Sequence, residues 1–246
     1  MTNEQKCALI ILDGWGIGAS DESNAIAAAE TPFMDNMLAS HPQATLRTDG
    51  EFVGLPKGQM GNSEVGHMNI GAGRVVYQDL LRINRAVADD SFQNETVLNV
   101  AFDQAKTRRT RLHFMGLVSQ GGVHSQQEHL HALCKAAAAR GIADFAIHAF
   151  TDGRDTSPQK ALAYMADLES VLTETGGRVA TVHGRYYSMD RDNRWERIAR
   201  SYGTLVRSEG DQYESAGAGI QAHYDDGITD EFIRPFVVGE PLAIQP

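Results

Sequence analysis

Cysteine is scarce in this chain, which has two cysteines, Cys7 and Cys134, among its 246 residues. Cys7 lies in a short apolar run near the start, and Cys134 lies in an alanine-rich helical pattern. Two thiols in such surroundings predict reduced residues of the protein core rather than a disulfide. We therefore expect a protein of the cytoplasm.

Long apolar runs and an excess of positive charge are also missing. No segment reaches the roughly 20 apolar residues of a membrane-spanning helix, and the first apolar run is too short for a secretory signal peptide. The 22 Lys and Arg residues face 32 Asp and Glu residues, which gives a net charge of −10. This balance argues against nucleic acid or an anionic membrane as the main partner, although a local arginine cluster can still bind a small anion.

The chain does contain a regular alternation of strand and helix patterns. Residues 112–118, 144–150 and 178–183 predict strands, and residues 124–140, 158 to about 173 and 194–206 predict helices. Gly141 is expected to end the first of these helices, and Pro158 to lie in the first turn of the second. The alternation predicts an α/β fold built from parallel βαβ units, with a further strand at 232–239.

Three loops directly follow the predicted strands, at residues 119–124, 151–156 and 184–191. Because parallel strands end at one edge of a sheet, we expect these loops to lie together there. They carry five candidate site residues, which are His124, Arg154, Asp155, Arg185 and Arg191. Guanidinium groups bind phosphate and carboxylate through paired hydrogen bonds, so the cluster predicts a small anionic ligand. Any one of these arginines, taken alone, would fit a solvated surface charge.

The segment 58–74, GQMGNSEVGHMNIGAGR, holds five glycines around Ser63. Its composition allows tight turns and close approach of a ligand to the backbone, and it fits a serine presented where a helix begins. A glycine-rich surface loop fits the composition equally well. Residues 8–15, ALIILDGW, predict a buried parallel strand that ends at Asp13, although an Asp-Gly pair is also common in turns.

Five motifs in a fixed order make the interpretation more specific. They are DGWG at 13–16, GQMGNSEVGHMNIGAGR at 58–74, GGVHS at 121–125, DGRDT at 152–156 and GRYYSMDRD at 184–192. Together they resemble the cofactor-independent (2,3-bisphosphoglycerate-independent) phosphoglycerate mutases, a family of the alkaline phosphatase superfamily. The resemblance extends from about residue 7 to residue 239.

The resemblance implies an isomerase of glycolysis and gluconeogenesis that interconverts 3-phosphoglycerate and 2-phosphoglycerate. Ser63 would carry the phosphoryl group as phosphoserine, and Asp155 would act as the acid/base on the substrate hydroxyl. The carboxylate and phosphate of the substrate would be held by His124, Arg154, Asp155, Arg185 and Arg191. Asp13 and Ser63 would bind metal, with two Mn²⁺ ions in the complete family site.

The resemblance also implies two domains. Residues 1–77 would begin a metal-binding, alkaline-phosphatase-like domain, and residues 78–246 would form an inserted, incomplete α/β transferase domain. Family chains are much longer, so the other metal ligands are expected beyond Pro246. The isolated chain is then expected to be inactive and to expose the apolar strand at 8–15 for want of partner strands. A monomer is expected when the protein is complete.

Two other functions stay open at this point. A metal-dependent phosphohydrolase of the same superfamily would use the same serine but would not need the GGVHS, DGRDT and GRYYSMDRD loops. A non-catalytic phosphoglycerate-binding fragment is the other alternative. The histidines favour neither alternative. His148 and His183 are expected at buried positions in strands, and His67 is expected to have a structural role in the loop that carries Ser63. His124, His129 and His131, expected on one helix, lack the spacing of a zinc site.

Overall fold

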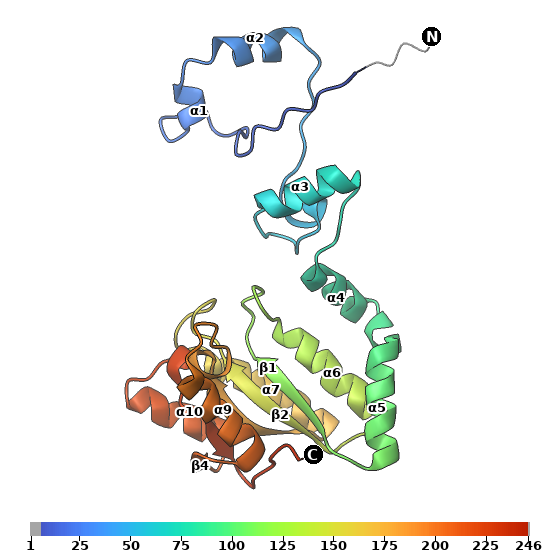
Figure 1. Cartoon of the computed structure of the whole chain (residues 1–246), viewed down its shortest axis with the longest axis vertical. Coiled ribbons are helices and arrows are strands. Elements are labelled where there is room, and N and C mark those ends of the chain that lie inside the picture. Colours follow the sequence, from blue (N-terminus) through green and yellow to red (C-terminus); the bar gives the residue numbers. More distant parts are fainter. Residues whose placement is uncertain (1–5, 246) are drawn as a thin grey trace. The chain divides into compact units, whose positions relative to one another are not determined.

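The computed structural model describes residues 6–245, which form two compact units that divide between Leu81 and Arg82 (Figure 1). We expected a division between residues 77 and 78. The identities of the units as phosphatase-like and transferase domains stay predictions. Among the described residues, no helix combines the length and apolar content that crossing a bilayer requires.

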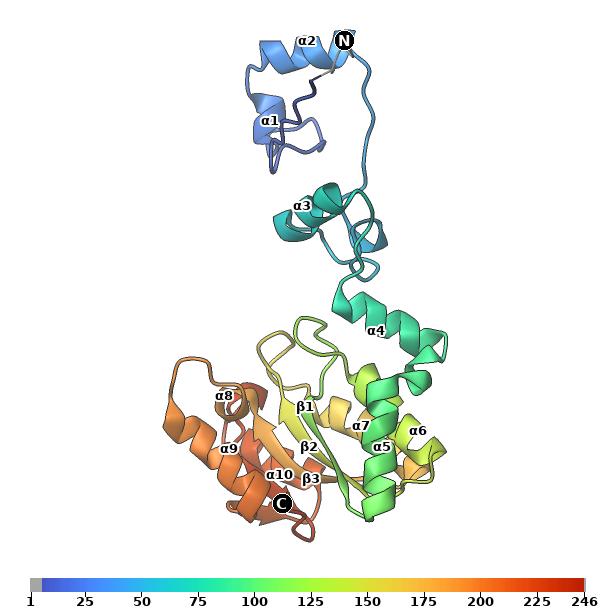
Figure 2. The ribbon, with the colours of Figure 1, turned by 45° about the vertical axis from the view of Figure 1, so that its right-hand side comes forward.

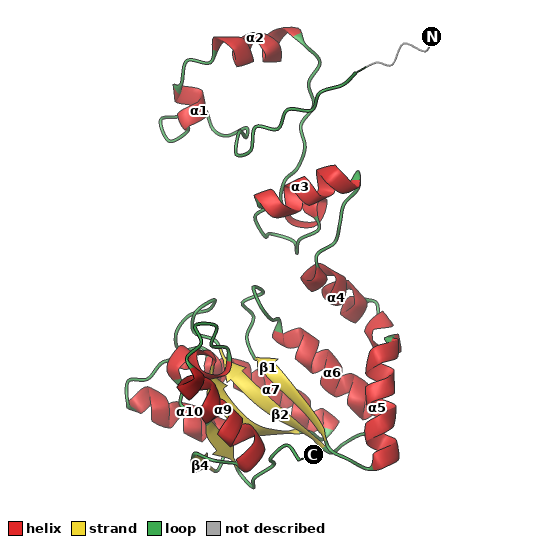
Figure 3. Cartoon of the chain, in the orientation of Figure 1, coloured by secondary structure: helices red, strands yellow, loops and turns green. Residues whose placement is uncertain are grey.

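The first unit is helical wherever its described residues have regular structure (Figure 3). Its elements are α1 (Ala25–Ala28), α2 (Pro32–Ser40), the 3-10 helix η1 (Gly50–Val53) and α3 (Ser63–Ala72), and α4 (Asp79–Ala88) contains the boundary. Val53, Leu55 and Val65 form a small buried cluster between η1 and α3. In the described part of this unit, the buried apolar cluster therefore lies in the segment around α3.

The predicted strand at 8–15 is wrong, because residues 8–12 have no regular structure and pair with no strand. Asp13 and Gly14 form a turn closed by the Trp15 N–H on the Leu12 oxygen at 3.1 Å, which is the alternative that the Asp-Gly pair allowed. Leu9 is 73% exposed and Ile10 is 81% exposed, so the expected exposure of apolar side chains is present. A strand needs neighbouring strands to accept its backbone hydrogen bonds, and the described residues of this unit contain none. Cys7 is accordingly exposed rather than part of a core, whereas Cys134 is buried as predicted.

The second unit is built on a five-stranded sheet in the order β1-β2-β3-β5-β4. The strands are β1 (Leu112–Leu117), β2 (Phe145–Thr151), β3 (Arg178–Gly184), β4 (Asp211–Tyr213) and β5 (Phe236–Val238). The first three are parallel, which confirms the predicted βαβ units. The predicted strand at 232–239 forms only at β5, and it pairs antiparallel with β3, so the sheet is not wholly parallel.

Helices lie between the strands of this unit, so the predicted α/β alternation is present. They are η2 (Ser91–Asn94), α5 (Thr96–Arg108), α6 (Gln127–Ala139), α7 (Ala161–Thr175), α8 (Arg185–Ser188), α9 (Trp195–Arg207), α10 (Ala216–Asp225) and η3 (Asp230–Phe232). His124 lies before α6, so the expectation that His124, His129 and His131 share one helix is wrong. Pro158 lies in the loop before α7, because that helix begins where Asp230 Oδ2 accepts the N–H groups of Lys160 and Ala161 at 2.8 and 2.9 Å.

The two faces of the sheet differ in chemistry. One face is apolar, and side chains such as Phe145, Ile147 and Val182 pack there with residues of α5, α6, α7 and α10. On the other face, the buried rings of His148 and His183 share the Thr181 hydroxyl, at 2.8 and 2.6 Å. His183 also contacts Ser201 of α9 at 3.2 Å. Both histidines are therefore buried and partnered within strands, as predicted.

The direction of the three parallel strands decides where the loops lie. Strand β1 ends just before a predicted loop, and β2 and β3 end at the first residue of theirs. Helix α8 occupies residues 185–188 of the third predicted loop. The three segments gather at that end of the sheet (Figure 2). Gly122, Gly153 and Gly184 lie in or at the start of these loops, and a Cβ on Gly184 would meet the backbone oxygen of Glu231 at 2.4 Å. The backbone after β3 therefore packs directly on the segment around η3.

Candidate functional site

The loops after β1, β2 and β3 enclose a polar cavity of about 400 Å³ in the second unit. The cavity is lined by His124, Arg154, Asp155, Arg185, Tyr186, Met189, Asp190, Arg191, Asp192, Arg197 and Glu231. The structure thus brings together all five residues that the sequence suggested for an anion site. It adds Tyr186, Asp190, Arg197 and Glu231, which the sequence reasoning did not select.

Arg185 is the most constrained guanidinium of this cavity. Its Nη1 donates to Asp152 Oδ1 at 2.7 Å and to Asp155 Oδ2 at 2.6 Å, and its side chain is 9% exposed. Charge-assisted hydrogen bonds of this kind are about twice as strong as neutral ones. Arg185 is therefore held in one orientation at the floor of the cavity before any ligand binds.

Asp152 holds Arg185 in place by accepting a hydrogen bond from its Nη1, although the sequence reasoning assigned Asp152 no role. Its side chain is buried, and burial on its own would raise the pKa of the carboxyl. Hydrogen bonds from the Asp155 N–H, the Ser119 hydroxyl and the Arg185 guanidinium outweigh burial, so its pKa lies below its ordinary value. Asp152 is an anchor that stays charged, and a signal for it was present in the DGRDT motif.

Asp155 is one of four carboxylates that line the cavity, with Asp190, Asp192 and Glu231. Its Oδ2 accepts from Arg185 and lies 3.8 Å from His124 Nε2, and the side chain is 18% exposed. A carboxylate with one fixed donor keeps free lone pairs that can accept a proton or a hydrogen bond from a ligand hydroxyl. Asp155 can therefore serve as a base, or as an acceptor that orients a hydroxyl.

Two guanidinium groups remain available for an anion. Arg154 is 62% exposed, and its Nη1 is 3.4 Å from Glu231 Oε1, a long and weakly held ion pair. Arg191 is exposed, and among the described residues it has no hydrogen bond or ion pair. These two groups, and His124 in the same cavity, can bind phosphate or carboxylate oxygens, because few existing contacts would be lost.

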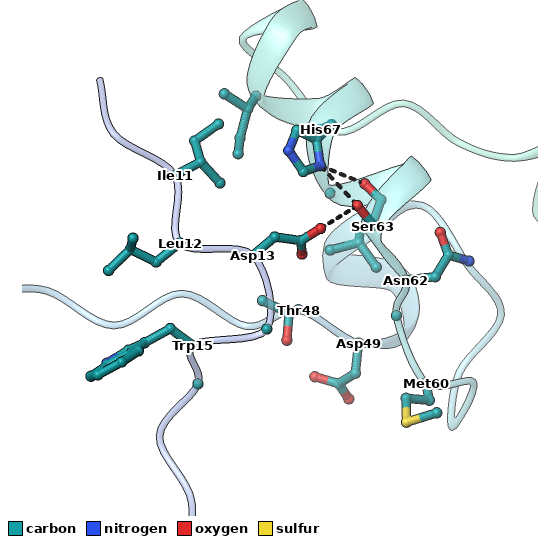
Figure 4. A pocket seen from close by; sticks show the side chains of 16 residues that line it. Ile11, Leu12, Asp13, Trp15, Thr48, Asp49, Met60, Asn62, Ser63 and His67 are labelled. Atoms are coloured by element: carbon teal, nitrogen blue, oxygen red, sulfur yellow. Dashed lines mark hydrogen bonds between the residues drawn. The ribbon is translucent and has the colours of Figure 1, made fainter. Parts of the chain in front are cut away.

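Ser63 lies in a separate cavity of about 540 Å³ within the first unit (Figure 4). The sequence fixes its position, because Asn62 is the N-cap of α3 and its Oδ1 accepts the Val65 N–H at 3.0 Å. Ser63 is then the first helical residue, as the turn-and-helix interpretation predicted. The glycines were expected to let a ligand approach the backbone closely. At Gly61 it is another part of the backbone that approaches, since a Cβ there would lie 1.7 Å from the Thr48 carbonyl oxygen.

The hydroxyl of Ser63 is hydrogen-bonded on two sides (Figure 4). The hydroxyl donates to Asp13 Oδ2 at 2.6 Å, and His67 Nδ1 lies 3.2 Å from Ser63 Oγ. His67 Nδ1 is also 2.8 Å from the backbone oxygen of Ser63, one turn earlier in α3. The structure therefore brings together Asp13 and Ser63, which are fifty residues apart in the sequence.

Asp13 and Ser63 are suited in kind to a hard divalent ion, which prefers oxygen ligands. Two oxygen donors are fewer than the four to six that such ions take. Among residues 6–245 no group of three or more His, Cys, Asp or Glu side chains is placed to hold a metal. The described residues therefore fit part of a metal site.

Comparison with known proteins places this geometry in a family. The family described as the BPG-independent PGAM N-terminus, where BPG is 2,3-bisphosphoglycerate and PGAM is phosphoglycerate mutase, matches residues 83–245. The chain belongs to this family. The matched region contains the whole cavity around Arg185, and the Ser63 cavity precedes it.

Relatives named 2,3-bisphosphoglycerate-independent phosphoglycerate mutase match almost the whole chain. The protein of Myxococcus xanthus is 52% identical over 239 residues, which cover 97% of this chain and 47% of that protein. The protein of Natronomonas pharaonis is 52% identical over 235 residues, covering 95% and 46%. The chain therefore spans about half the length of the curated relatives that it matches.

A solved structure extends the family likeness to the fold. A phosphoglycerate mutase from Leishmania mexicana, studied at low cobalt concentration, matches with a TM-score of 0.71 and 31% identity. The match covers 96% of this chain and 46% of that one. The resemblance inferred from the five motifs is thus confirmed at the level of family and fold, whereas the roles of individual residues remain predictions.

Proposed function

We propose that this chain supplies the N-terminal half of a cofactor-independent phosphoglycerate mutase, which interconverts 2-phosphoglycerate and 3-phosphoglycerate. The observation that carries the proposal is the cavity in which Arg154, Arg185 and Arg191 meet His124 and Asp155. Its cations suit a ligand with a carboxylate and a phosphate, and Asp155 suits the hydroxyl between them. The names of the relatives point to the same substrate.

In the proposed reaction, Ser63 takes the phosphoryl group from the substrate. A bond forms between Ser63 Oγ and phosphorus as the proton of the Ser63 hydroxyl passes to water. The bond from phosphorus to the substrate oxygen breaks, and that oxygen takes a proton from Asp155. The second hydroxyl of glycerate then gives its proton to Asp155 and bonds to phosphorus. The bond from phosphorus to Ser63 Oγ breaks and Oγ regains a proton from water, so the isomer forms with no net gain or loss of atoms. The Ser63 hydroxyl donates a hydrogen bond to Asp13 Oδ2 at 2.6 Å, so Asp13 orients the hydroxyl and favours its deprotonation.

Asp13 and Ser63 are the described residues proposed to hold a divalent ion, which we take to be Mn²⁺. A bound ion would lower the pKa of the hydroxyl and offset phosphate charge. The further ligands are proposed to come from the part of the relatives' length that this chain does not span. Two free thiols, exposed Cys7 and buried Cys134, fit the reducing cytoplasm proposed for this protein.

A second candidate is a phosphoglycerate-binding protein without catalysis. It is favoured by the two-donor metal site, since Asp13 and Ser63 alone leave a divalent ion short of ligands. A phosphohydrolase is less well supported, because releasing phosphate to water does not require an elaborate cavity for the leaving alcohol. These candidates make different predictions for the same preparation.

The experiment joins this chain to the C-terminal half of the Myxococcus xanthus relative and couples the product to enolase in the presence of Mn²⁺. We expect turnover of 3-phosphoglycerate by the chimera and its loss in Ser63→Ala, with the fold retained. Ser23→Ala, which changes an exposed serine of the same unit, is the matched control and should keep full activity. Near wild-type turnover by Ser63→Ala would refute the nucleophile, and phosphate release without isomerisation would favour the hydrolase.

A further inference from the structure

The loop between α8 and α9 is folded around one buried carboxylate. Asp190 has a side chain that is 2% exposed. Its Oδ2 accepts the N–H groups of Asp192 at 3.3 Å and Arg194 at 2.8 Å, while its Oδ1 accepts from Arg197 Nη1 at 2.9 Å. A buried carboxylate needs such partners, so the loop backbone and the Arg197 guanidinium are tied to the same group.

Arg197 is held on a second side by an aromatic ring. Its Cζ lies 3.9 Å from the centre of the Tyr186 ring, within the range of a cation–π contact. The Tyr186 ring is packed in turn against Phe232 of η3, with ring centres 5.1 Å apart. The guanidinium therefore stacks with one face on Tyr186 and binds Asp190 with one edge, which fixes its orientation at 21% exposure.

Arg191 is placed by this loop and by no contact of its own. It directly follows Asp190, it is exposed, and its guanidinium has no hydrogen bond or ion pair among the described residues. Two residues later Asn193 adopts a left-handed backbone conformation, with φ of 59°, which an asparagine tolerates better than most residues. The position of Arg191 in the cavity therefore depends on the fold of residues 190–194.

We propose that Arg197 is a positioning residue, which sets the loop that carries Arg191 and acts on the ligand through Arg191. The ligand in this inference is the phosphoglycerate of the proposed function. Arg197 also lines the cavity, so direct contact with the ligand is the competing interpretation. The ion pair with Asp190 and the stacking on Tyr186 favour the positioning role, because they tie the guanidinium to the loop that carries Arg191 without any ligand.

A double-mutant cycle separates the two interpretations. Binding of 3-phosphoglycerate to the 246-residue chain is measured by calorimetry for Arg191→Ala, Arg197→Ala and the double variant. We expect losses of about 10- to 100-fold for Arg191→Ala and about 10-fold for Arg197→Ala. The double variant should bind no more weakly than Arg191→Ala, because the second change then has nothing left to position. Fully additive losses would overturn the proposal.

The control for the cycle is Arg207→Ala, which removes a guanidinium from the last turn of the same helix. Arg207 pairs with Glu209 at the surface, at 2.5 Å, and does not line the cavity. Its removal should leave 3-phosphoglycerate binding unchanged. A loss of binding equal to that of Arg197→Ala would show a general effect of charge and would also overturn the proposal.

A measurement on the ligand-free chain tests the positioning itself. The ¹⁵N heteronuclear NOE of residues 190–194 should fall in Arg197→Ala and stay unchanged in Arg207→Ala, with both variants melting as folded proteins. Should Arg197→Ala not fold, Tyr186→Leu removes the stacking partner and should lower the same values. An unchanged NOE would overturn the inference. If the unaltered chain does not bind 3-phosphoglycerate, the proposed function fails, while this measurement still decides the role of Arg197.

Discussion

Replacing Arg185 with alanine should affect stability as well as binding, in contrast to the exposed cavity arginines Arg154 and Arg191. The change leaves the carboxylate of Asp152, which is 3% exposed, without its guanidinium partner. Removing one member of a buried ion pair costs about 3–5 kcal/mol. Asp152 keeps the Ser119 hydroxyl and two backbone N–H groups, so we expect the lower end, about 3 kcal/mol at pH 7.

The pH dependence gives this prediction a sign. The folded-state pKa of Asp152 lies below its ordinary value, so its contribution to stability is present above the unfolded pKa of about 3.9 and is lost as pH falls through the folded pKa. In Arg185→Ala the carboxyl gains a proton more readily, which relieves the uncompensated charge. The difference in unfolding free energy between the variant and the parent should therefore shrink below about pH 4.

Urea denaturation followed by far-UV circular dichroism measures this difference in the full chain. Arg154→Ala is the matched comparison, since Arg154 is 62% exposed and its pair with Glu231 is long. It should change stability by less than about 1 kcal/mol, while it weakens 3-phosphoglycerate binding by about one power of ten. Equal stability losses in the two variants, or a loss in Arg185→Ala that does not depend on pH, would refute the reasoning.

Two further predictions concern acid sensitivity and proton transfer. Burial lowers the pKa of His148 to about 4 and that of His183 to about 3. The neutral rings therefore stabilise the fold fully above the unfolded pKa of about 6.5, and this contribution is lost as pH falls. Between pH 7 and pH 5, each histidine should lower the free energy of unfolding by about 2 kcal/mol. Urea unfolding of His148→Gln should show a flatter profile, and a profile as steep as the parent's would contradict this. In the chimera, Asp155→Asn should lower kcat more than it raises KM, and the opposite pattern in steady-state kinetics would assign Asp155 to binding.

The features that the sequence predicted well depend on short-range patterns. Strands β1, β2 and β3 are short apolar runs, and parallel pairing follows from the helices between them. Once the strands are parallel, their following loops share an edge, so the meeting of Arg154, Arg185 and Arg191 could be predicted. Ser63 at the start of α3 was predictable because the N-cap Asn62 directly precedes it.

The features that the sequence reasoning missed depend on contacts between distant residues. The run at 8–15 has a strand-like composition, but a strand needs a partner and the described part of the first unit offers none. Helix α7 begins at Ala161 because Asp230, 69 residues later, accepts its N–H. Arg197 resembles any arginine of an amphipathic helix until its contacts with Tyr186 and Asp190 are seen.

The different environments of the two cysteines give this protein a natural site for labelling. Cys7 is exposed, whereas burial raises the pKa of Cys134 to about 12. Because the thiolate is the reactive form, a maleimide at neutral pH should attach to Cys7 and spare Cys134. Cys7 lies six residues before Asp13, in the first unit, so a fluorophore there would report on the surroundings of the Ser63 cavity without any cysteine being engineered.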